Sequence, residues 1–374
     1  MPSWLKEGRG SLCGANVSLL LREMGITKPL LVAGERTKNV FFARTGMRLP
    51  VFDAFHPNPD LQDCVAGAAL YQEKGCDGLI SIGGGSAMDT AKGIKALLMT
   101  DIAHVRANQL PSEGNVPHLA IPGTAGTGAE TTAVAVLYEN GQKLSVDHPA
   151  LLPDGVLLDG SLLDTLPEYH RKSCAMDALA QGIESWWAKK ATPDSRIHAE
   201  RAIRGVLDNL TAYLQGDRKA QDEMLHAAYE SGVAILTTRT TAAHAMSYQI
   251  TKKLGAAHGH ACMLTLPHLW AHLAAQAEYQ PMLTELSRIL GGEKPMDGAI
   301  LLKGLLAVLE LDKIPMPDDA TLDMLAASVN PERLGNHPEA LTTAQLRAIY
   351  VQAFTPMTDT ERAEAIAAWE QYGK

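Results

Sequence analysis

The chain has 374 residues, which at about 150 residues per domain is enough for two or three domains and a large core. Apolar residues make up 46% and charged residues 20%, and these values exclude a disordered or fibrous protein. The net charge of -9 argues against nucleic acid or an anionic membrane as partner.

The cysteines are scattered and odd in number, and none forms a CxxC or CxxH spacing, so we expect neither a disulfide framework nor a thiolate zinc site. The N-terminus lacks the apolar segment of a signal peptide, and no run of about 18 apolar residues occurs. We therefore expect a soluble cytoplasmic protein. The five cysteines are Cys13, Cys64, Cys76, Cys174 and Cys262.

In chain order, the first 165 residues alternate short apolar runs with helical stretches, which predicts an α/β domain with an open sheet. Helices are expected at Leu61–Lys74 and Ala87–Leu98. The predicted strands are Leu30–Ala33, Pro50–Phe55, Gly78–Ile82, Leu119–Pro122, Ala133–Tyr138 and Val156–Leu158.

From residue 166 to 374 the sequence consists of Ala-, Leu- and Glu-rich segments with apolar residues three and four apart. This composition and spacing predict an all-α domain. Helix ends are expected at Thr192-Pro193, Gly216-Asp217, Gly255, Gly291-Gly292 and Pro315 to Pro317.

A glycine-rich turn, Gly83-Gly84-Gly85-Ser86, follows the strand at 78–82 and precedes a helix. Residues without side chains let a phosphate approach the backbone, and the N–H groups of the following helix stabilise its charge. The alternative is a local cap, with Ser86 as N-cap and Asp89 completing a capping box. The turn is not the GxGxxG of ordinary dinucleotide-binding folds.

A second loop of small residues, 122–132, also follows an apolar run and contains Thr124 and Thr127. Alone it could be a plain wide turn. Two such loops in one α/β half favour a dinucleotide site, because ligands bind at the carboxyl ends of parallel strands.

The helical half carries polar residues with metal-ligand chemistry. Asp177 and Gln181 are four apart and share one helix face, as do His244 and Tyr248, and His258 and His260 follow the break at Gly255. An aspartate, two histidines and a further oxygen donor suit a divalent metal. The alternative is that these buried polar groups only satisfy one another.

Together these motifs resemble the iron-containing (group III) alcohol dehydrogenase family over nearly the whole chain. The resemblance rests on ordered motifs: His56-Pro57-Asn58-Pro59, the turn at 83–86 with Asp89 and Lys92, Thr124 to Thr127, Met176 to Leu179 with Ile183-Glu184, and His258-Gly259 leading to Leu266-Pro267-His268.

The resemblance implies an N-terminal dinucleotide-binding domain, 1–165, and a helical metal-binding and substrate domain, 166–374. Cofactor contacts implied by the matching motifs are Asn58, Gly84, Gly85, Ser86, Asp89, Thr124, Thr127 and Lys143. The implied metal ligands are Asp177, Gln181, His244 and His258, and they would hold Fe²⁺, Zn²⁺ or another divalent cation.

Two positions depart from the family pattern, in which histidines are usual. Gln181 stands four after the aspartate, where its carbonyl oxygen can still coordinate a cation. Tyr248 stands four after His244, and it or His260 is the expected proton-transfer group. The alternative for His260 is a purely structural histidine.

The segment 237–248 with Gln181 resembles a subgroup that includes phosphonoacetaldehyde and sulfoacetaldehyde reductases. Arg239 would bind the anionic head group, and a structural arginine is the alternative. After the first strand, Gly34 lacks the side chain that repels a 2′-phosphate and Glu35 restores a negative charge, so we favour NAD(H) and leave NADP(H) open.

We thus expect a metal-dependent NAD(P)H-linked reductase of a small aldehyde, with the aldehyde or alcohol as its partner and a homodimer or larger homo-oligomer as its assembly. Three alternatives stay open: a general short-chain alcohol or diol dehydrogenase, an NAD-using lyase of the dehydroquinate synthase type, and a non-catalytic oligomerising relative.

Overall fold

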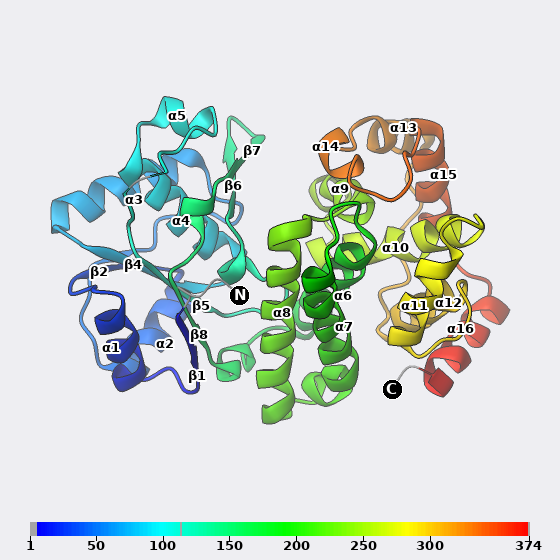
Figure 1. The fold of residues 1–374 in the computed structure, drawn as a ribbon, viewed down its shortest axis with the longest axis horizontal. Helices are drawn as coiled ribbons and strands as arrows, with labels where there is room; N and C mark the ends of the chain where they lie inside the picture. The colour runs from blue at the N-terminus through cyan, green and yellow to red at the C-terminus, as the bar shows by residue number, and fades with distance from the viewer. Residues whose placement is uncertain (1–5, 113, 373–374) are drawn as a thin grey trace. The chain divides into compact units, whose positions relative to one another are not determined.

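Two units make up the chain in this computed structural model, Met1–Thr165 and Leu166–Lys374, and the structure describes residues 6–112 and 114–372. The first unit is built on a six-stranded sheet and the second is helical (Figure 1). The predicted fold class, an α/β unit followed by an all-α unit, is confirmed. None of the described helices is long and apolar enough to cross a membrane.

The sheet of the first unit has the strand order β1-β8-β5-β4-β2-β3, and every pairing is parallel. The chain passes from β2 outward to β3 and then returns to β4 on the other side of β2. The carboxyl ends of β2 and β4 therefore flank a topological switch point, where open α/β sheets bind ligands. The strands are β1 Lys6–Arg9, β2 Pro29–Ala33, β3 Val51–Phe52, β4 Gly78–Gly83, β5 His118–Pro122 and β8 Gly155–Leu158.

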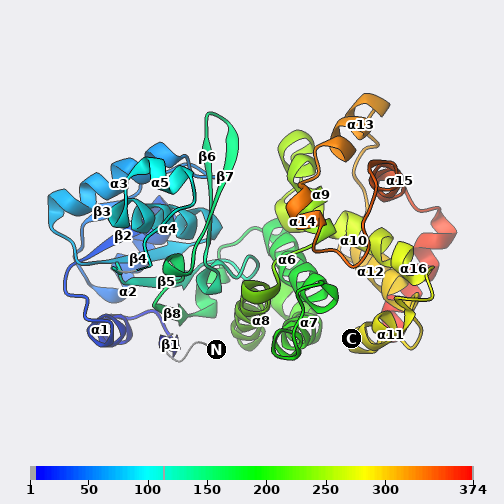
Figure 2. The same ribbon diagram turned by 45° about the horizontal axis from the view of Figure 1, so that its top comes forward.

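Helices cover both faces of this sheet (Figures 1 and 2). Successive residues of a strand point to opposite faces of the sheet, so each apolar strand contributes side chains to two hydrophobic cores, one on each face. Leu30 and Leu79 pack with α3 and α4, whereas Leu31 and Ile80 pack with α1 and α2. The helices are α1 Gly14–Glu23, α2 Glu35–Thr45, α3 Leu61–Lys74, α4 Gly85–Met99 and α5 Ile102–Arg106.

The strand expected at Ala133–Tyr138 forms as β6, Val134–Glu139, but it lies outside the main sheet. It pairs antiparallel with β7, Gln142–Asp147, which the sequence analysis did not predict. The turn between them is Asn140-Gly141 with φ angles of 52° and 72°. An Asn-Gly pair is a strong hairpin signal because both positions of a type I′ turn need positive φ.

In the second unit, helices begin or end at the breaks that the sequence predicted. Thr192 caps α7 through its side chain with Pro193 in the first turn, and Gly255 ends the π-helical segment η4 (Ile250–Leu254). The helices are α6 Glu168–Trp187, α7 Pro193–Leu214, α8 Arg218–Thr238, α9 Ala242–Gln249, α10 His258–Ala274, α11 Gln280–Leu290, α12 Asp297–Val308, α13 Asp319–Ala327, α14 Pro331–Leu334, α15 Thr343–Phe354 and α16 Asp359–Tyr372.

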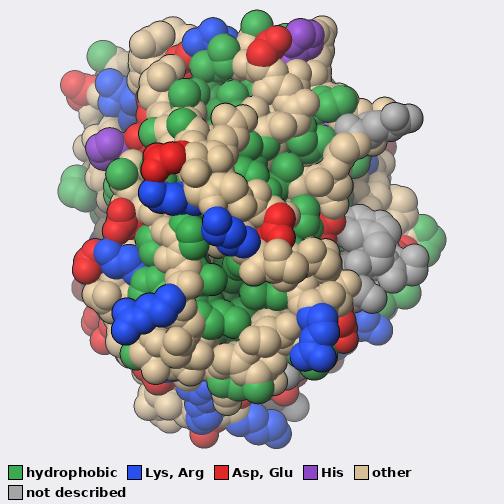
Figure 3. All heavy atoms as spheres, turned by 90° about the vertical axis from the view of Figure 1, so that its left-hand side faces the viewer, with side chains coloured by type: hydrophobic (Ala, Val, Ile, Leu, Met, Phe, Trp, Pro, Cys, Tyr) green, Lys and Arg blue, Asp and Glu red, His purple; other side chains and the backbone are tan. Residues whose placement is uncertain are grey.

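Charges of both signs are interspersed on the face of the molecule drawn in Figure 3. Among the described residues seen there, lysine and arginine side chains do not gather into a basic patch. This face is therefore unlike a surface that binds a phosphate backbone.

His337 is buried and packs edge-on against Trp187, with ring centroids 5.7 Å apart. Neither of its ring nitrogens has a hydrogen-bond partner among the described residues. Burial lowers the pKa of His337 to about 3, with a smaller contribution from His272. Below about pH 6.5 the unfolded chain therefore binds a proton that the folded chain refuses, so stability falls as the pH falls from 6.5 toward 3.

His337→Phe is expected to weaken this acid sensitivity. One titrating histidine contributes about 1.4 kcal/mol per pH unit, so the variant should show a shallower loss of unfolding free energy between pH 6.5 and 5. Urea titrations at several pH values measure the slope. Replacing the exposed His170 by glutamine is the control and should leave it unchanged. An unchanged slope in His337→Phe would show that the buried ring does not titrate as proposed.

Candidate active site

A cluster of four side chains from three helices lies in the second unit. Asp177 comes from α6, His244 from α9, and His258 and Cys262 from α10. One potential ligand atom of each lies within 4.8 Å of all the others. The Nε2 atom of His244 is 3.2 Å from Asp177 Oδ1, and that of His258 is 3.9 Å from the same oxygen.

The other nitrogen of each imidazole is held by a second partner. Glu184 Oε2 contacts Nδ1 of His244, and Ser247 Oγ lies 3.3 Å from Nδ1 of His258. Metal-binding histidines typically use one ring nitrogen for the ion while a carboxylate or other polar group fixes the second. Both Nε2 atoms are thus oriented toward Asp177.

Glu184 joins α6 to the start of α9. Its Oε1 accepts hydrogen bonds from the backbone N–H groups of Thr241 at 3.0 Å and Ala243 at 2.9 Å, and from the Thr241 hydroxyl at 2.6 Å. These N–H groups would otherwise lack partners at the start of α9, where no side chain of the helix itself caps. A buried carboxylate at this positive helix end is stabilised, and it fixes the backbone that carries His244.

The electrostatics of the cluster favour an anionic Asp177 and a positively charged His244 in the metal-free protein. Burial opposes ionisation of Asp177, but His258 and His244 outweigh it and hold the carboxyl pKa below its usual range. Burial likewise opposes protonation of His244, but Cys262 and Glu184 raise its pKa well above the ordinary value. Asp177, Glu184 and Cys262 thus attract positive charge to this point, and a divalent cation that displaces the imidazole protons would meet the same attraction.

Gln181 lies beside Asp177, and its amide nitrogen, not its oxygen, points toward that carboxylate. Its Nε2 faces Asp177 Oδ1 at 3.5 Å, while its Oε1 accepts a hydrogen bond from the Ser231 hydroxyl at 2.8 Å. In this orientation the N–H group, which cannot coordinate a cation, faces Asp177, and the oxygen faces Ser231. The structure therefore places Asp177, His244 and His258 together with Gln181 beside Asp177, and it adds Cys262, which was not predicted, to the cluster.

The two expected proton-transfer residues have different surroundings. Tyr248 is half-buried and stacks on the His258 ring, with ring centroids 6.2 Å apart and an interplanar angle of 2°. His260 bonds through Nδ1 to the Tyr169 hydroxyl at 3.1 Å and through Nε2 to the Leu311 carbonyl at 2.8 Å. The structure thus gives His260 a packing role and leaves Tyr248 next to the cluster.

Arg239 follows α8 and is half-buried, with its Nη1 donating to the Leu236 carbonyl at 3.0 Å. Its backbone has φ 63° and ψ 176°, a region that glycine adopts far more easily than other residues. The hydroxyls of the neighbouring Thr238, Thr240 and Thr241 are engaged with protein groups. The Thr240 hydroxyl accepts from Arg333 and keeps its own proton for a further partner.

In the first unit, the two small-residue loops meet at the carboxyl ends of β4 and β5. Gly123 N–H donates to the Gly83 carbonyl at 2.7 Å. A Cβ on Gly84 would lie 3.2 Å from Thr124 Cγ2, and one on Gly85 would lie 3.5 Å from Thr127 Cγ2. The N-cap of α4 is Gly84 and no side chain caps it. The alternative of Ser86 as N-cap is therefore wrong, and the start of α4 is suited to an anion.

The other predicted cofactor contacts lie around this turn and the hairpin. Asn58 adopts a φ of 57° and donates its backbone N–H to Ser86 Oγ at 3.3 Å. Asp89 faces the hairpin instead of the turn, because its carboxylate accepts a backbone hydrogen bond from Val136 and lies near Lys143. Lys143 is exposed on β7.

Lys92, from the same motif, is fully buried. Its Nζ donates to the carbonyls of Ala129 at 2.7 Å and Val134 at 3.0 Å, and to Thr132 Oγ1 at 3.1 Å. Lys92 therefore fastens the end of the second loop to α4.

Glu35 begins α2 directly after β2, at the switch point of the sheet. Its exposed carboxylate pairs with Lys38 at 2.5 Å and accepts from Asn39 Nδ2 at 3.1 Å. Hydrogen bonds from Lys38 and Asn39 lower the pKa of this carboxyl. A carboxylate paired with Lys38 therefore stands at the switch point, where open α/β sheets bind ligands.

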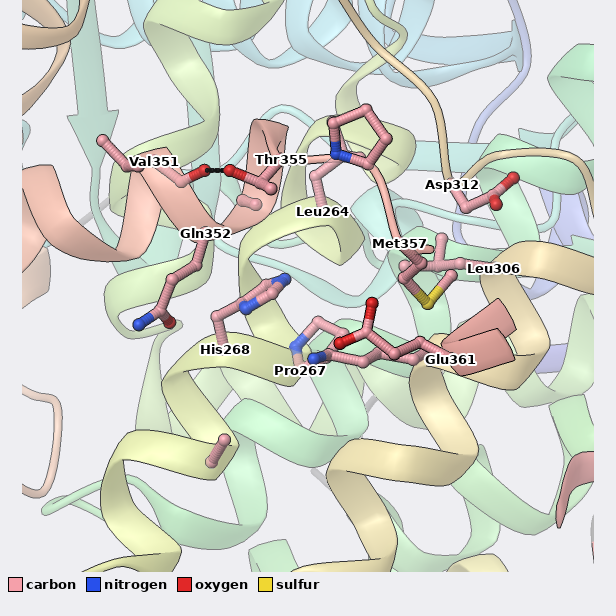
Figure 4. A pocket seen from close by; sticks show the side chains of 14 residues that line it. Leu264, Pro267, His268, Leu306, Asp312, Val351, Gln352, Thr355, Met357 and Glu361 are labelled. Atoms are coloured by element: carbon pink, nitrogen blue, oxygen red, sulfur yellow. Dashed lines mark hydrogen bonds between the residues drawn. The ribbon is translucent and has the colours of Figure 1, made fainter. Parts of the chain in front are cut away.

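A cavity of about 400 Å³ lies among α10, α12, α15 and α16, and none of the predicted site residues lines it (Figure 4). Burial and the nearby Lys303 lower the pKa of His268 in its wall to about 4. Among the lining residues are Pro267, His268, Lys303, Gln352, Met357 and Glu361.

Comparison with known proteins identifies the family. The profile described as iron-containing alcohol dehydrogenase matches residues 3–160, and that of the Fe-containing alcohol dehydrogenase family, C-terminal, matches residues 172–354. The NAD-dependent methanol dehydrogenase of Bacillus methanolicus is 30% identical over 75% of this chain and 77% of its own length. The chain therefore belongs to the iron-containing alcohol dehydrogenase family.

Two further relatives narrow the class. The phosphonoacetaldehyde reductase of Streptomyces viridochromogenes is 36% identical, over 57% of this chain and 58% of its own length. The sulfoacetaldehyde reductase of Bifidobacterium kashiwanohense, solved in complex with NAD⁺, is 26% identical with a TM-score of 0.85, over 95% of this chain and 97% of its own. The chain is an oxidoreductase of the alcohol dehydrogenase and aldehyde reductase class, and it resembles this subgroup.

Sequence reasoning missed Cys262 because cysteines were examined only for CxxC and CxxH spacings. The available signal was its position four residues after His258 within one predicted helix, which puts both side chains on the same face one turn apart.

Proposed function

We propose that this protein reduces a two-carbon aldehyde with an anionic head group, such as sulfoacetaldehyde or phosphonoacetaldehyde, to its alcohol with NADH as the hydride source. The observation that carries the proposal is the convergence of Asp177, His244 and His258 in a chain of this family. Relatives that act on neutral alcohols, such as methanol dehydrogenase, support a short-chain alcohol or diol dehydrogenase as the second candidate.

Asp177, His244 and His258 would hold a divalent cation, and their donor atoms fit one because two imidazole nitrogens and a carboxylate oxygen face a common point. When bound, such a cation polarises a carbonyl oxygen and stabilises the negative charge that hydride addition places on it. Glu184 and Ser247 keep the two imidazoles oriented.

Tyr248 is the proposed proton donor to the product alkoxide. Its ring is parallel to His258, so the phenol is held beside the proposed ligand. A phenolic hydroxyl can give its proton to an alkoxide, which is a far stronger base than a phenolate.

The turn of Gly84 and Gly85 would receive the dinucleotide pyrophosphate. The uncapped start of α4 offers N–H donors and the positive end of the helix dipole, and the absence of side chains leaves space for phosphate oxygens. The dinucleotide supplies the hydride. Asn58, Ser86, Thr124 and Thr127 border this turn and are proposed as further contacts.

Arg239 is proposed to bind the anionic head group. Its unfavourable backbone conformation, five residues before His244, costs on the order of 1–3 kcal/mol, and such strain is typically kept at functional positions. A guanidinium offers paired donors that match tetrahedral oxyanions.

The test is a steady-state panel of sulfoacetaldehyde, phosphonoacetaldehyde, glycolaldehyde and propionaldehyde, with NADH or NADPH, in protein loaded with Fe²⁺ or Zn²⁺. We expect NADH and the anionic aldehydes to give the highest kcat/KM. In Arg239→Ala, kcat/KM should fall about 100-fold for sulfoacetaldehyde and less than about 3-fold for propionaldehyde, because a charged hydrogen bond contributes about 1.5–3 kcal/mol.

Arg196→Ala is the matched control, since Arg196 is also half-buried in the second unit and bonds to the Trp186 carbonyl. It should affect both aldehydes equally. Equal losses in Arg239→Ala would reject the head-group role, and a preference of the wild type for neutral aldehydes would favour the second candidate.

A further inference from the structure

We infer that the Sγ atom of Cys262 is the fourth protein ligand of the metal, in the place that the sequence pattern assigns to Gln181. This inference rests on the proposed function, because it concerns the same cation. It changes the donor set from two nitrogens and two oxygens to two nitrogens, one oxygen and one sulfur.

The distances within the cluster are longer than those of a single tetrahedral centre, but all four ligand atoms lie within 4.8 Å of one another. With metal–nitrogen and metal–oxygen bonds of about 2.0–2.1 Å and a metal–sulfur bond of about 2.3 Å, neighbouring ligand atoms are roughly 3.3–3.6 Å apart. Cys262 Sγ lies 3.9 Å from His258 Nε2, the same separation as between His258 Nε2 and Asp177 Oδ1. Inward movement of these side chains would be needed for all four atoms to reach one ion.

Helix geometry points Cys262 at this centre. His258 and Cys262 are four residues apart on α10, so both side chains project from the same face. The close approach of α10 to α6 keeps that face against Asp177: a Cβ on Gly259 would lie 2.0 Å from the Ser173 carbonyl oxygen and 2.7 Å from Asp177 Cβ. Cys262 itself is completely buried.

Gln181 presents its amide N–H group, and not its carbonyl oxygen, to Asp177. Its Oε1 accepts from Ser231, and its Nε2 faces Asp177 Oδ1, the carboxylate oxygen nearest both imidazoles. In this arrangement Gln181 is a positioning residue that donates to the Asp177 carboxylate. A sulfur donor also bears on metal choice, since thiolate ligands favour Zn²⁺ over the hard cations that prefer all-oxygen sites.

Cobalt substitution tests the assignment without measuring turnover. Full-length protein stripped with chelator is titrated with Co²⁺, because a thiolate bound to Co²⁺ gives a near-ultraviolet charge-transfer band that oxygen and nitrogen ligands do not give. We expect the wild type to show this band and the zinc-loaded protein to show a sulfur shell at about 2.3 Å by X-ray absorption.

Three variants complete the experiment. Cys262→Ala should lose the band and bind Zn²⁺ at least about 100-fold more weakly, since even partners of ligands contribute 10–100-fold. Gln181→Leu should keep the band. Cys64→Ala, which removes an equally buried sulfur from the first unit, should match the wild type in both measurements.

Urea unfolding in chelator checks that every variant folds. A cobalt-loaded wild type without the band, or a Cys262→Ala protein that keeps it, overturns the assignment while leaving the proposed function standing. A wild type that binds no divalent cation overturns both.

Discussion

Asp177→Asn is expected to lower kcat/KM for aldehyde reduction about 1,000-fold and to leave the purified protein nearly free of metal. Asp177 provides the only carboxylate oxygen in the four-residue cluster, and an amide of the same shape carries no charge to hold a cation. Loss of carbonyl polarisation at several kcal/mol corresponds to about three orders of magnitude in rate. Metal content by mass spectrometry and steady-state kinetics measure the two effects.

The same substitution should destabilise the metal-free protein by about 3 kcal/mol, because it removes a buried anion from beside His244 and His258. Asp312→Asn is the matched control: Asp312 is a buried carboxylate of the same unit, bonded to Arg362 at 2.8 Å. The control should lose stability but keep its metal and its activity per metal. An Asp177→Asn protein with full metal content would remove Asp177 from the ligand set.

Gly84→Ala is expected to raise the KM for NADH about 100-fold while metal content stays unchanged. The added Cβ occupies the space in front of the α4 N-terminus and lies 3.2 Å from Thr124 Cγ2, so a phosphate that needs this space is displaced. A misplacement of about 1 Å costs about this factor in a bound complex. Fluorescence titration with NADH gives the affinity directly.

The double variant Gly84→Ala with Thr124→Ser separates two explanations. Serine removes the Cγ2 atom that the new methyl group meets, so local strain is relieved while the phosphate stays obstructed. NADH affinity should therefore remain low. Recovery to the level of Thr124→Ser alone would show that the loss came from packing between the loops and that Gly84 is not a phosphate contact.

The architecture was predictable because the apolar segments of the sequence are bounded by glycines and by helix-capping residues. The strand at 78–83 and the helix at 61–74 are bounded by glycines and by the Asp60 cap, so their limits could be read almost to the residue. The second strand of the hairpin, β7, was not predicted because the Asn140-Gly141 turn, which pairs it with β6, was overlooked.

The candidate site was predictable where a helical spacing brings residues onto one face. Asp177 and Glu184 are seven apart on α6, and both reach His244. His260 was grouped with His258, yet residues two apart on a helix point in nearly opposite directions, and His260 accordingly packs against Tyr169 and Leu311. The orientation of the Gln181 amide depends on Ser231, fifty residues away, and no local pattern reveals it.

The backbone conformation of Arg239 costs conformational free energy, and a role for the arginine side chain would explain why this residue stands there. Glycine would adopt φ 63° and ψ 176° without strain, so exchanging the arginine for glycine should make the fold more tolerant of heat. Laboratory evolution of this protein for thermostability alone would then drift toward glycine at 239, and under the proposed head-group role it would lose discrimination between charged and neutral aldehydes. Under the same proposed role, selection that includes turnover of an anionic aldehyde would retain the arginine, so thermostability and substrate selectivity would be opposed at position 239.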